Sequence, residues 1–563
     1  MLHPGHPSPS APLPFPRPSL RLSIPIHHPF SVSASSNSKP NAYLVVLAYL
    51  RQLIQISVMG QTVTKEPPTE FLPPTQTREE LQERFKWRLA KFYMSDAQSE
   101  WFQTIFNIFC TESDSAKFWT ETDLENFMTS TFPPALASFV AEAGPIVHRC
   151  LLRLGSFPYH NDPHHTLSPD VLRTAMIILL GLDGRKLLDQ DNDEASLVYP
   201  DRLSTKQRIL LFQSMAKQKG TPGSSRGPEE DYHLQKALDL ITYGNFKRNK
   251  RFPTAVTEGP EYPSIEHFPS SNSTLTSGSI PAEDFRPLLR LMLLTQLYVA
   301  GIDPDNFTSS PSEIEAATEC LLAAFLNAAD SPAVPFTAFD NILGNSMQQN
   351  TFLGLPRVLG PLRSVKSFPS ATPPSSVTEA QKVLKELFTP TAKTAPPPKG
   401  LLMSLPLMSQ LSMSLPQDFP IETPETLYSS PEVDVKSVKS CLSVTRTARI
   451  LLVSGKAGQE VAIFGAYFPK NSSPAVPRVI VQLSPVHRTF HGAQELDASQ
   501  KTEFEDNSHL TVGLSDMTFV LSGDSAAGSF IAQFGNGTSQ EFAVDAVEVL
   551  SFEGSMVRVD TFE

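Results

Sequence analysis

The chain has 563 residues, a net charge of −12 and 51 prolines, and 40% of its residues are apolar. A chain of this length exceeds what one hydrophobic core usually supports, so we expect more than one folded unit. Because the prolines cluster, long stretches are predicted not to pack at all. The acidic balance and the lack of a basic stripe with interleaved aromatic residues argue against a nucleic-acid groove.

Four cysteines are widely and irregularly spaced: Cys110, Cys150, Cys320 and Cys441. No pair has the short spacing of a zinc site or redox motif, so we expect reduced thiols in a cytosolic protein. The one dense basic run, residues 247–251, lies in a proline-rich, polar neighbourhood. We interpret it as a solvated loop, with a localisation signal or anionic-lipid patch as the alternative.

Residues 1–58 differ in composition from the rest of the chain. No acidic residue occurs before Glu66, and Pro, Ser and His dominate the first 40 residues. The apolar stretch 43–50 is far shorter than the roughly 20 residues that a membrane-spanning helix needs. An organelle transit peptide is one interpretation of this leader.

A lipidation motif favours another interpretation of the same leader. Met59-Gly60 is followed by Thr64, four residues after the glycine, as N-myristoylation requires. The acyl chain is attached to a free α-amine, so Gly60 must become the N-terminal residue. We therefore expect residues 1–58 to be a disordered leader or a gene-model extension, and 59–76 to be a polar, myristoylation-type segment. One myristoyl chain gives only marginal membrane binding, about 10⁴ M⁻¹.

From residue 77 onward, apolar residues recur at the three- and four-residue spacing of amphipathic helices. Thr77 with Glu80, and Thr120 with Asp123, have the spacing of helix caps, and Pro169 opens a strongly apolar helix. The expected boundaries are a helical block (77–219), a partly disordered linker (220–280), a second helical block (281–363) and a Pro-rich linker (364–422). Within the last linker we expect a lone helix over 379–388, and we expect residues 401–415 to pack onto the next domain.

An acidic run in the first helical block resembles half of a calcium loop. Asp189, Asp191 and Asp193 alternate as in an EF-hand, which also needs Gly at its sixth position and Glu at its twelfth. This chain has Glu194 and Pro200 there. We therefore expect a degenerate, EF-hand-like helix–loop–helix, no metal site and no cofactor.

After residue 426 the pattern changes to short, β-branched-rich runs bounded by turn residues. We predict that residues 423–563 form antiparallel sheets packed face to face as a β-sandwich, which makes the whole chain an α+β multidomain protein. The predicted strands cover 450–454, 461–468, 478–483, 517–521, 529–534 and 542–552.

Ordered motifs in this region resemble a TLDc domain: Leu427–Ser430, Ala448–Gly455, Ile463–Tyr467, Gln482–Val486, Gly523–Ser525, Phe534–Gly537 and Val544–Phe552. The order and spacing carry the resemblance. The motif residues that it singles out are Phe464, Gly465, Tyr467, Gly523, Asp524, Phe534, Gly535, Asn536 and Glu548. The chain departs from the family pattern at Pro431–Val433, where a glycine-containing turn is usual, and in the short connection from Gly455 to Val461.

The helical blocks before this region, which contain Leu154–Pro158 and Phe339–Leu343, resemble those of the fungal restriction of telomere capping protein 5 family. That resemblance implies an EF-hand-like helical region before a TLDc domain, and a Met-Gly start. It further implies a non-catalytic regulator or adaptor with protein partners, among them subunits of the vacuolar proton-ATPase, and links to oxidation resistance and telomere capping. The implied location is the cytoplasm, with peripheral contact at the vacuole membrane through acylated Gly60.

A serine hydrolase is the alternative function. Gly523-Asp524-Ser525 is similar to a protease nucleophile triplet, but it continues without the glycine that helps form an oxyanion hole. The candidate bases His487, His491 and His509 lie in no recognisable catalytic context. The carboxylates Glu541 and Glu548 are interpreted as surface or turn-stabilising residues. Gly455-Lys456 lacks the remaining P-loop residues. A tight turn explains the triplet better, so we expect no catalysis.

Overall fold

The computed structural model divides the chain into two compact units, residues 1–73 and 74–563. Everything described below belongs to the second unit. The residues that the structure describes are 77–113, 116–159, 166–183, 205–217, 233–238, 278–326, 331–347, 354–363, 374–390, 400–415, 424–443, 446–470, 477–492, 501–503, 508–523, 528–535 and 537–552. Three features predicted from sequence lie outside them: the Met59-Gly60 motif, the acidic run 189–193 and the basic run 247–251.

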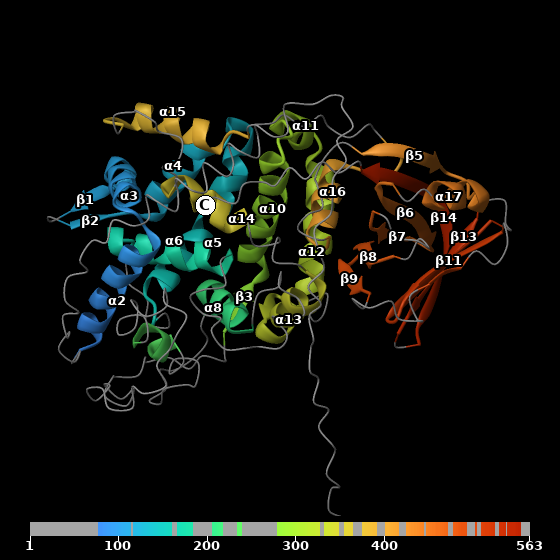
Figure 1. Ribbon diagram of the computed structural model, residues 1–563, viewed down its shortest axis with the longest axis horizontal. Coiled ribbons are helices and arrows are strands. Elements are labelled where there is room, and N and C mark those ends of the chain that lie inside the picture. Colours follow the sequence, from blue (N-terminus) through green and yellow to red (C-terminus); the bar gives the residue numbers. More distant parts are fainter. Residues whose placement is uncertain are drawn as a thin grey trace, which may run out of the picture. The chain divides into compact units, whose positions relative to one another are not determined.

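The first helices begin at their predicted caps (Figure 1). Thr77 Oγ1 accepts from the Glu80 amide at 3.2 Å, and Thr120 and Asp123 form a reciprocal capping box. A second such box, Ser95 with Gln98, was not predicted. The elements in this region are α2 (Arg78–Tyr93), α3 (Asp96–Phe109), β1 (Thr111–Ser113), β2 (Ala116–Phe118), α4 (Glu121–Thr131), η1 (Pro134–Leu136), α5 (Ala137–Gly155), α6 (Pro169–Asp183) and α8 (Thr205–Met215). The expected helical starts are thus confirmed.

Aromatic side chains fill the core of these helices. The rings of Phe106 and Trp119 stack with centroids 5.4 Å apart, and Phe127 meets Trp119 at 5.1 Å. All three residues are buried. The aromatic stripe of the sequence is therefore packing, in agreement with its helical spacing.

A second set of helices continues the same core: β3 (Ser279–Pro281), α10 (Ala282–Val299), α11 (Pro304–Thr308), α12 (Pro311–Phe325), β4 (Ala333–Pro335), α13 (Phe336–Asn341), η3 (Ile342–Ser346), α14 (Gly354–Leu359), η5 (Gly360–Leu362), α15 (Val377–Phe388) and α16 (Leu405–Ser412). Both α15 and α16 lie in the range 364–422 that the sequence predicts as a Pro-rich linker. Helix α15 is the lone helix expected at 379–388, and α16 lies in the stretch 401–415 that was expected to pack onto the next domain. Phe388 of α15 packs on Phe132 with ring centroids 4.6 Å apart. All eight residues of α16 are buried.

The segment Pro134–Gly155 is long and apolar enough to cross a membrane by length and composition. It comprises η1 and α5, and α5 packs against α4, α6, α8 and α10. Its buried face includes Val147, Leu151 and Leu154. The helix therefore serves as a core element of the folded helical region.

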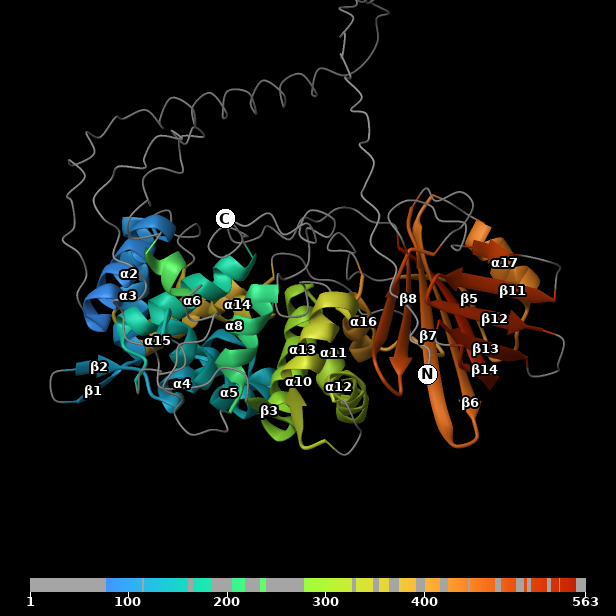
Figure 2. The same ribbon diagram turned by 90° about the horizontal axis from the view of Figure 1, so that it is seen from below.

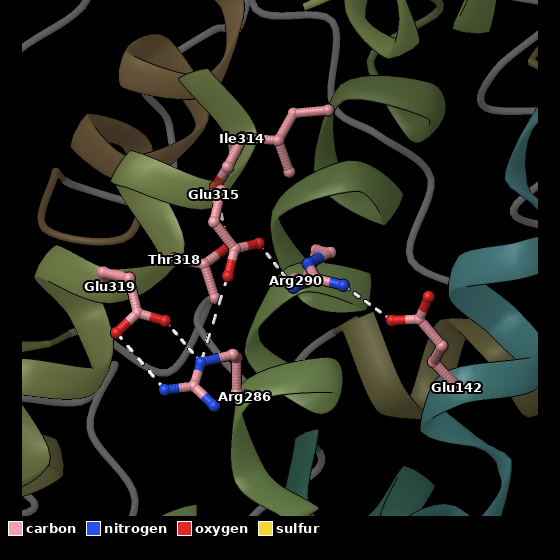
Figure 3. A network of polar contacts seen from close by, with 7 residues as sticks. All are labelled: Glu142, Arg286, Arg290, Ile314, Glu315, Thr318 and Glu319. Carbon is pink, nitrogen blue, oxygen red and sulfur yellow. Dashed lines mark hydrogen bonds and ion pairs between the residues drawn. The ribbon is translucent and has the colours of Figure 1, made fainter. Parts of the chain in front are cut away.

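Two arginines of α10 tie that helix to its neighbours (Figure 3). Arg290 donates to Glu142 of α5 at 2.6 Å and also pairs with Glu315 of α12. Arg286 pairs with Glu319 of α12. The Arg290 side chain is 14% exposed and that of Arg286 is 35% exposed, so water screens the second arginine more than the first.

Replacing Arg290 by Met is expected to lower the free energy of unfolding by about 1–2 kcal/mol, because it breaks two partly buried ion pairs that join three helices. The matched Arg286→Met change removes a more exposed pair and is expected to cost less than about 1 kcal/mol. Urea denaturation of both variants checks the order. Equal losses, or a larger loss for Arg286→Met, would contradict the role given to Arg290.

The C-terminal strands form one antiparallel sheet in the order β10-β11-β12-β13-β14-β6-β7-β8-β9, with β5 also paired to β14 (Figure 2). Their bounds are β5 (Glu425–Ser430), β6 (Ala448–Ala457), β7 (Glu460–Phe468), β8 (Val479–Ser484), β9 (Arg488–His491), β10 (Lys501–Glu503), β11 (His509–Leu514), β12 (Met517–Ser522), β13 (Ser529–Phe534) and β14 (Ser539–Phe552), with helix α17 (Val435–Ser443) after β5. The structure thus confirms an α+β chain with N-terminal helices and a large C-terminal antiparallel sheet.

One continuous sheet replaces the two sheets predicted from sequence, because β14 is long enough to serve two groups of strands. Its first part, Ser539–Ala543, pairs with β13. Its second part, from Val547 to Ser551, pairs with β5 along the same edge. Along its opposite edge β14 pairs with β6, with a register shift between Val544 and Ala546. The sheet curves enough for Phe464 of β7 to meet Phe530 of β13, with ring centroids 5.4 Å apart.

Strand β6 is buried on both faces, which explains its uninterrupted apolar run. Ile450 and Leu452 join the core shared with the helices, whereas Leu451 and Val453 join the core inside the curved sheet. Successive side chains of a strand point to opposite faces, so a strand between two cores needs apolar residues at every position. Figure 2 shows β7 and β8 on the side of the sheet nearer the helices.

Candidate functional site at the junction of the helices and the sheet

Helix α16 is the element that joins the helices to the sheet. It packs against α10 and α12 on one side and against β8 on the other. Ser404 caps its N-terminus, and Pro406 stands in its first turn, where a missing N–H costs no helical hydrogen bond. A Cβ at Gly465 of β7 would stand 3.8 Å from Leu411 of α16, so the motif glycine lies directly under this helix.

Polar side chains of α16 bond in both directions. The hydroxyl of Ser409 donates to the Leu293 carbonyl at 2.7 Å, and Ser412 donates to Gln296 Oε1 at 2.8 Å, both in α10. On the other side, the Gln410 amide donates to the Leu483 carbonyl of β8 at 2.8 Å. Because all of these groups are buried, breaking one bond would leave an unsatisfied polar atom.

His487, immediately before β9, is the ionisable centre of this junction. Its ring Nδ1 lies 3.1 Å from Gln410 Nε2, its Nε2 lies 2.8 Å from Ser414 Oγ, and its backbone N–H donates to the Cys320 carbonyl of α12. Ser414 also lies 2.6 Å from Thr489 Oγ1. Complete burial lowers the pKa of His487 to about 3, so the imidazole is neutral at neutral pH.

The tautomer of His487 follows from its partners. The Leu483 carbonyl can only accept, so the Gln410 atom beside it must be the amide nitrogen, which can only donate. His487 Nδ1 therefore accepts from Gln410, and the ring proton sits on Nε2 and points to Ser414.

This tautomer is the reverse of what serine catalysis needs. In a Ser–His pair the imidazole nitrogen beside the hydroxyl must be free to take its proton. Here Nε2 already carries a hydrogen, and Ser414 is fully buried. The Ser414–His487 pair is thus a structural hydrogen bond that joins the segment after α16 to the segment before β9.

Glu548 forms a second fixed point of the junction. Its carboxyl group, fully buried in β14, accepts from the backbone N–H groups of Leu401 and Met403, the latter at 2.9 Å, and from Ser429 Oγ of β5 at 3.0 Å. We call residues 400–403 the strap. An added Cβ at Gly400 would stand 2.9 Å from Glu548 Cδ and closer still to Oε1, so a larger residue would have to displace the carboxyl group from its hydrogen bonds.

The interpretation of Glu548 as a surface or turn-stabilising residue is therefore wrong. It failed because β14 is buried on both faces over its second half, where a carboxylate is retained only if backbone donors satisfy it. Glu541, by contrast, is exposed.

A buried arginine, Arg449 of β6, lies on the opposite face of the β14–β6 strand pair from Glu548. Arg449 of β6 donates through Nη1 to the carbonyls of Cys441 and Leu442, at the C-terminal end of α17. Its charge suits that end of the helix dipole. Burial lowers the pKa of this guanidinium below its usual value.

The motif residues predicted from the resemblance do not gather in one site. Phe464 lies in the core inside the sheet, Gly465 faces α16, and Tyr467 is 8% exposed in the core shared with the helices. Glu548 holds the strap.

Two motif glycines, Gly523 and Gly535, directly follow strands β12 and β13. The Gly523 N–H donates to the Ser508 carbonyl at 2.9 Å, and the Gly535 N–H to the Asp516 carbonyl at 2.9 Å. Phe534 is half-buried, near Phe490 and Arg488. Asp524, Asn536 and the hydrolase candidate Ser525 lie outside the described residues.

Sequence reasoning missed the groups that the junction depends on. Gln410 and Ser414 were visible as polar residues within the apolar stretch 401–415, and Gly400 as the residue that precedes it. Their partners lie more than 70 positions away along the chain, at His487 and Glu548. Only the fold brings these groups together.

Metal ligation has no support among the residues with described positions. They contain no group of three or more His, Cys, Asp or Glu side chains that could hold an ion. The four cysteines are free thiols. Burial raises the pKa of Cys150 to about 11, which keeps that thiol protonated and unreactive.

No family model matches the chain. It is similar to three curated fungal proteins called Restriction of telomere capping protein 5. That of Colletotrichum graminicola is 22% identical over 452 residues, which are 74% of this chain and 68% of the relative. That of Fusarium vanettenii is 23% identical over 459 residues with the same coverage, and that of Pyricularia oryzae is 24% identical over 367 residues, 59% of this chain and 56% of the relative. These similarities support a relationship to that family.

Proposed function

We propose that this chain is a non-catalytic, cytosolic regulatory protein with a TLDc domain over 423–563, which acts by binding other proteins. The observation that carries the proposal is the junction: helices and sheet are held together by buried, satisfied hydrogen bonds, and the Ser–His pair there has the tautomer that cannot act as a base. The names of the similar fungal proteins are consistent with a regulatory role.

The proposed partner is the vacuolar proton-ATPase, with oxidation resistance and telomere capping as the wider functions that the resemblance implies. The regulator would act by binding assembled and disassembled pump states with different affinity, because a ligand that prefers neither state shifts no equilibrium. Acylated Gly60 would hold the protein at the vacuole membrane. The helical blocks, EF-hand-like but metal-free, would support the sheet domain.

Affinity purification from a fungal host tests this proposal. The full chain and a chain started at Met59, each with and without Gly60→Ala, are tagged at the C-terminus and their partners identified by mass spectrometry. We expect pump subunits with both starts, and loss of membrane fractionation on Gly60→Ala only in the chain started at Met59. Failure to recover any pump subunit would refute the partner assignment.

The second candidate is a serine hydrolase that uses Ser525, favoured by the Gly-Asp-Ser triplet. A serine-directed fluorophosphonate probe distinguishes the two candidates. We expect no labelling of the native chain at either Ser525 or Ser414, and labelling that disappears in Ser525→Ala would establish the hydrolase instead.

A further inference from the structure

The C-terminal half of α2 presents aromatic rings to solvent. Trp87 is 55% exposed and Phe92 is 40% exposed. Large aromatic side chains usually bury most of their surface in a folded chain. The other tryptophans, Trp101 and Trp119, are buried, with their indole N–H groups bonded to the carbonyls of Pro361 and Phe106.

The opposite face of α2 is fixed in the helical core. Leu81, Phe85 and Leu89 are buried, and α2 packs against α6. Figures 1 and 2 place α2 at an edge of the helical region. Trp87 therefore stands on the solvent face of a fixed helix, and its presentation to solvent requires no refolding. Phe92 lies in the last turn, about 140° around the helix axis from Trp87. We call α2 residues 84–93 the ridge.

Cations surround the exposed tryptophan. Lys91 Nζ lies 4.9 Å and Arg88 Cζ lies 5.2 Å from the centre of the Trp87 ring. Residues 84–93 contain Arg84, Lys86, Arg88 and Lys91 and no acidic residue, although the whole chain has a net charge of −12. The acidic residues of α2 stand nearer its N-terminus, the last of them at position 83.

We propose that this ridge, α2 residues 84–93, binds the surface of an anionic lipid bilayer. Tryptophan and phenylalanine beside lysine and arginine are the side chains that lie at a membrane interface, the rings at headgroup depth and the cations on anionic headgroups. A bilayer accommodates both groups, because its surface is negative and its interface accepts aromatic rings.

The uneven distribution of charge along α2 determines how the helix is oriented on the bilayer. The basic, aromatic C-terminal half faces the bilayer, and the acidic first turns, with Glu79 and Glu80, point away from it. The contact requires neither an acyl chain nor the pump, so it goes beyond the proposed function. Failure of lipid binding would leave the pump proposal intact.

Tryptophan fluorescence provides a direct test, with the unacylated full chain made in bacteria and phosphatidylcholine vesicles with or without phosphatidylserine. We expect a blue shift and quenching by brominated lipids only with phosphatidylserine, and weaker binding at higher ionic strength. Trp87→Phe should abolish the spectral change while vesicle flotation persists, because the two remaining tryptophans are buried.

Charge variants supply the matched comparison. Removing one cation near an anionic surface weakens binding about fivefold, so Arg88→Gln with Lys91→Gln should weaken vesicle binding about thirtyfold. The control, Lys382→Gln with Lys385→Gln on the exposed face of α15, removes the same charge elsewhere and should change binding by less than about twofold. Equal weakening by both pairs, binding that ignores phosphatidylserine, or a blue shift that survives Trp87→Phe would overturn the proposal. The proposal would also be overturned if the chain did not bind vesicles but bound an acidic protein through this ridge.

Discussion

Replacement of Glu548 by alanine is expected to lower the free energy of unfolding by about 3–5 kcal/mol. The change removes a fully buried carboxyl group and leaves the N–H groups of Leu401 and Met403 and the hydroxyl of Ser429 without their acceptor. Hydrogen bonds to such a group are worth about 1.5–3 kcal/mol each, and three are lost together with packing. Hydrogen exchange at the Leu401 and Met403 amides should rise before global unfolding does.

Gly400→Ala disturbs the same contact between the strap and Glu548, by a change in the strap. The added Cβ would collide with the Glu548 carboxyl group, so either the strap or the carboxyl group must move and the hydrogen bonds between them are weakened. If both substitutions act through one contact, Gly400→Ala in the Glu548→Ala background should cost much less than it costs alone. Gly144→Ala in α5 is the control, because its Cβ would meet nothing within 4 Å and alanine favours a helix. Additive losses for Gly400 and Glu548 would contradict the strap contact.

Local sequence signals predicted the helices well where their ends are determined locally. The predicted caps at Thr77 and Thr120 lie within one turn of the groups that they satisfy, and Pro169 begins its helix as predicted. The strands β6 to β8 and β12 to β14 were likewise predicted, since each is a β-branched or aromatic run between turn residues. Strand β5 was indicated only by the resemblance at Leu427–Ser430, and β9, β10 and β11 were missed. They are short, or their residues alternate too weakly to mark a strand before a partner is known.

The architecture of the sheet depended on information that is not local. The uninterrupted apolar run of β6 indicated burial, but whether it lies between two sheets or between a sheet and helices depends on α16, which occupies the predicted linker. The continuity of the sheet depends on the length of β14 and its register shift. Both follow from pairing partners far apart in the chain.

The junction was the least predictable part for the same reason. A polar residue in an apolar stretch, such as Gln410, has several meanings until its partner is known. His487 was considered as a catalytic base, and only the Leu483 carbonyl beside the same amide determines that the ring accepts at Nδ1. Buried polar networks are specified by three-dimensional satisfaction, which a single sequence does not display.

His487 is expected to make the stability of the chain depend on pH. Its folded-state pKa, about 3, lies below the ordinary value of 6.5, so between these values the unfolded chain binds a proton that the folded chain does not. The stabilising contribution is therefore complete above pH 6.5 and is lost as the pH falls toward 3. At pH 5 the loss is about 2 kcal/mol, from 1.36 kcal/mol per pH unit over about 1.5 units.

Urea denaturation of the wild type and of His487→Gln between pH 7.5 and pH 4.5 measures this loss. Glutamine does not titrate, so the variant should lose about 2 kcal/mol less than the wild type on going to pH 5. Ser414→Ala is the matched control: it removes a hydrogen bond but leaves His487 buried, so it should cost about 1 kcal/mol at every pH with the pH slope unchanged. If His487→Gln keeps the wild-type slope, the junction histidine is protonated in the folded chain, and the tautomer assigned from Gln410 is wrong. If the unfolding free energy of Ser414→Ala also becomes independent of pH, the hydroxyl group and not burial keeps the ring neutral.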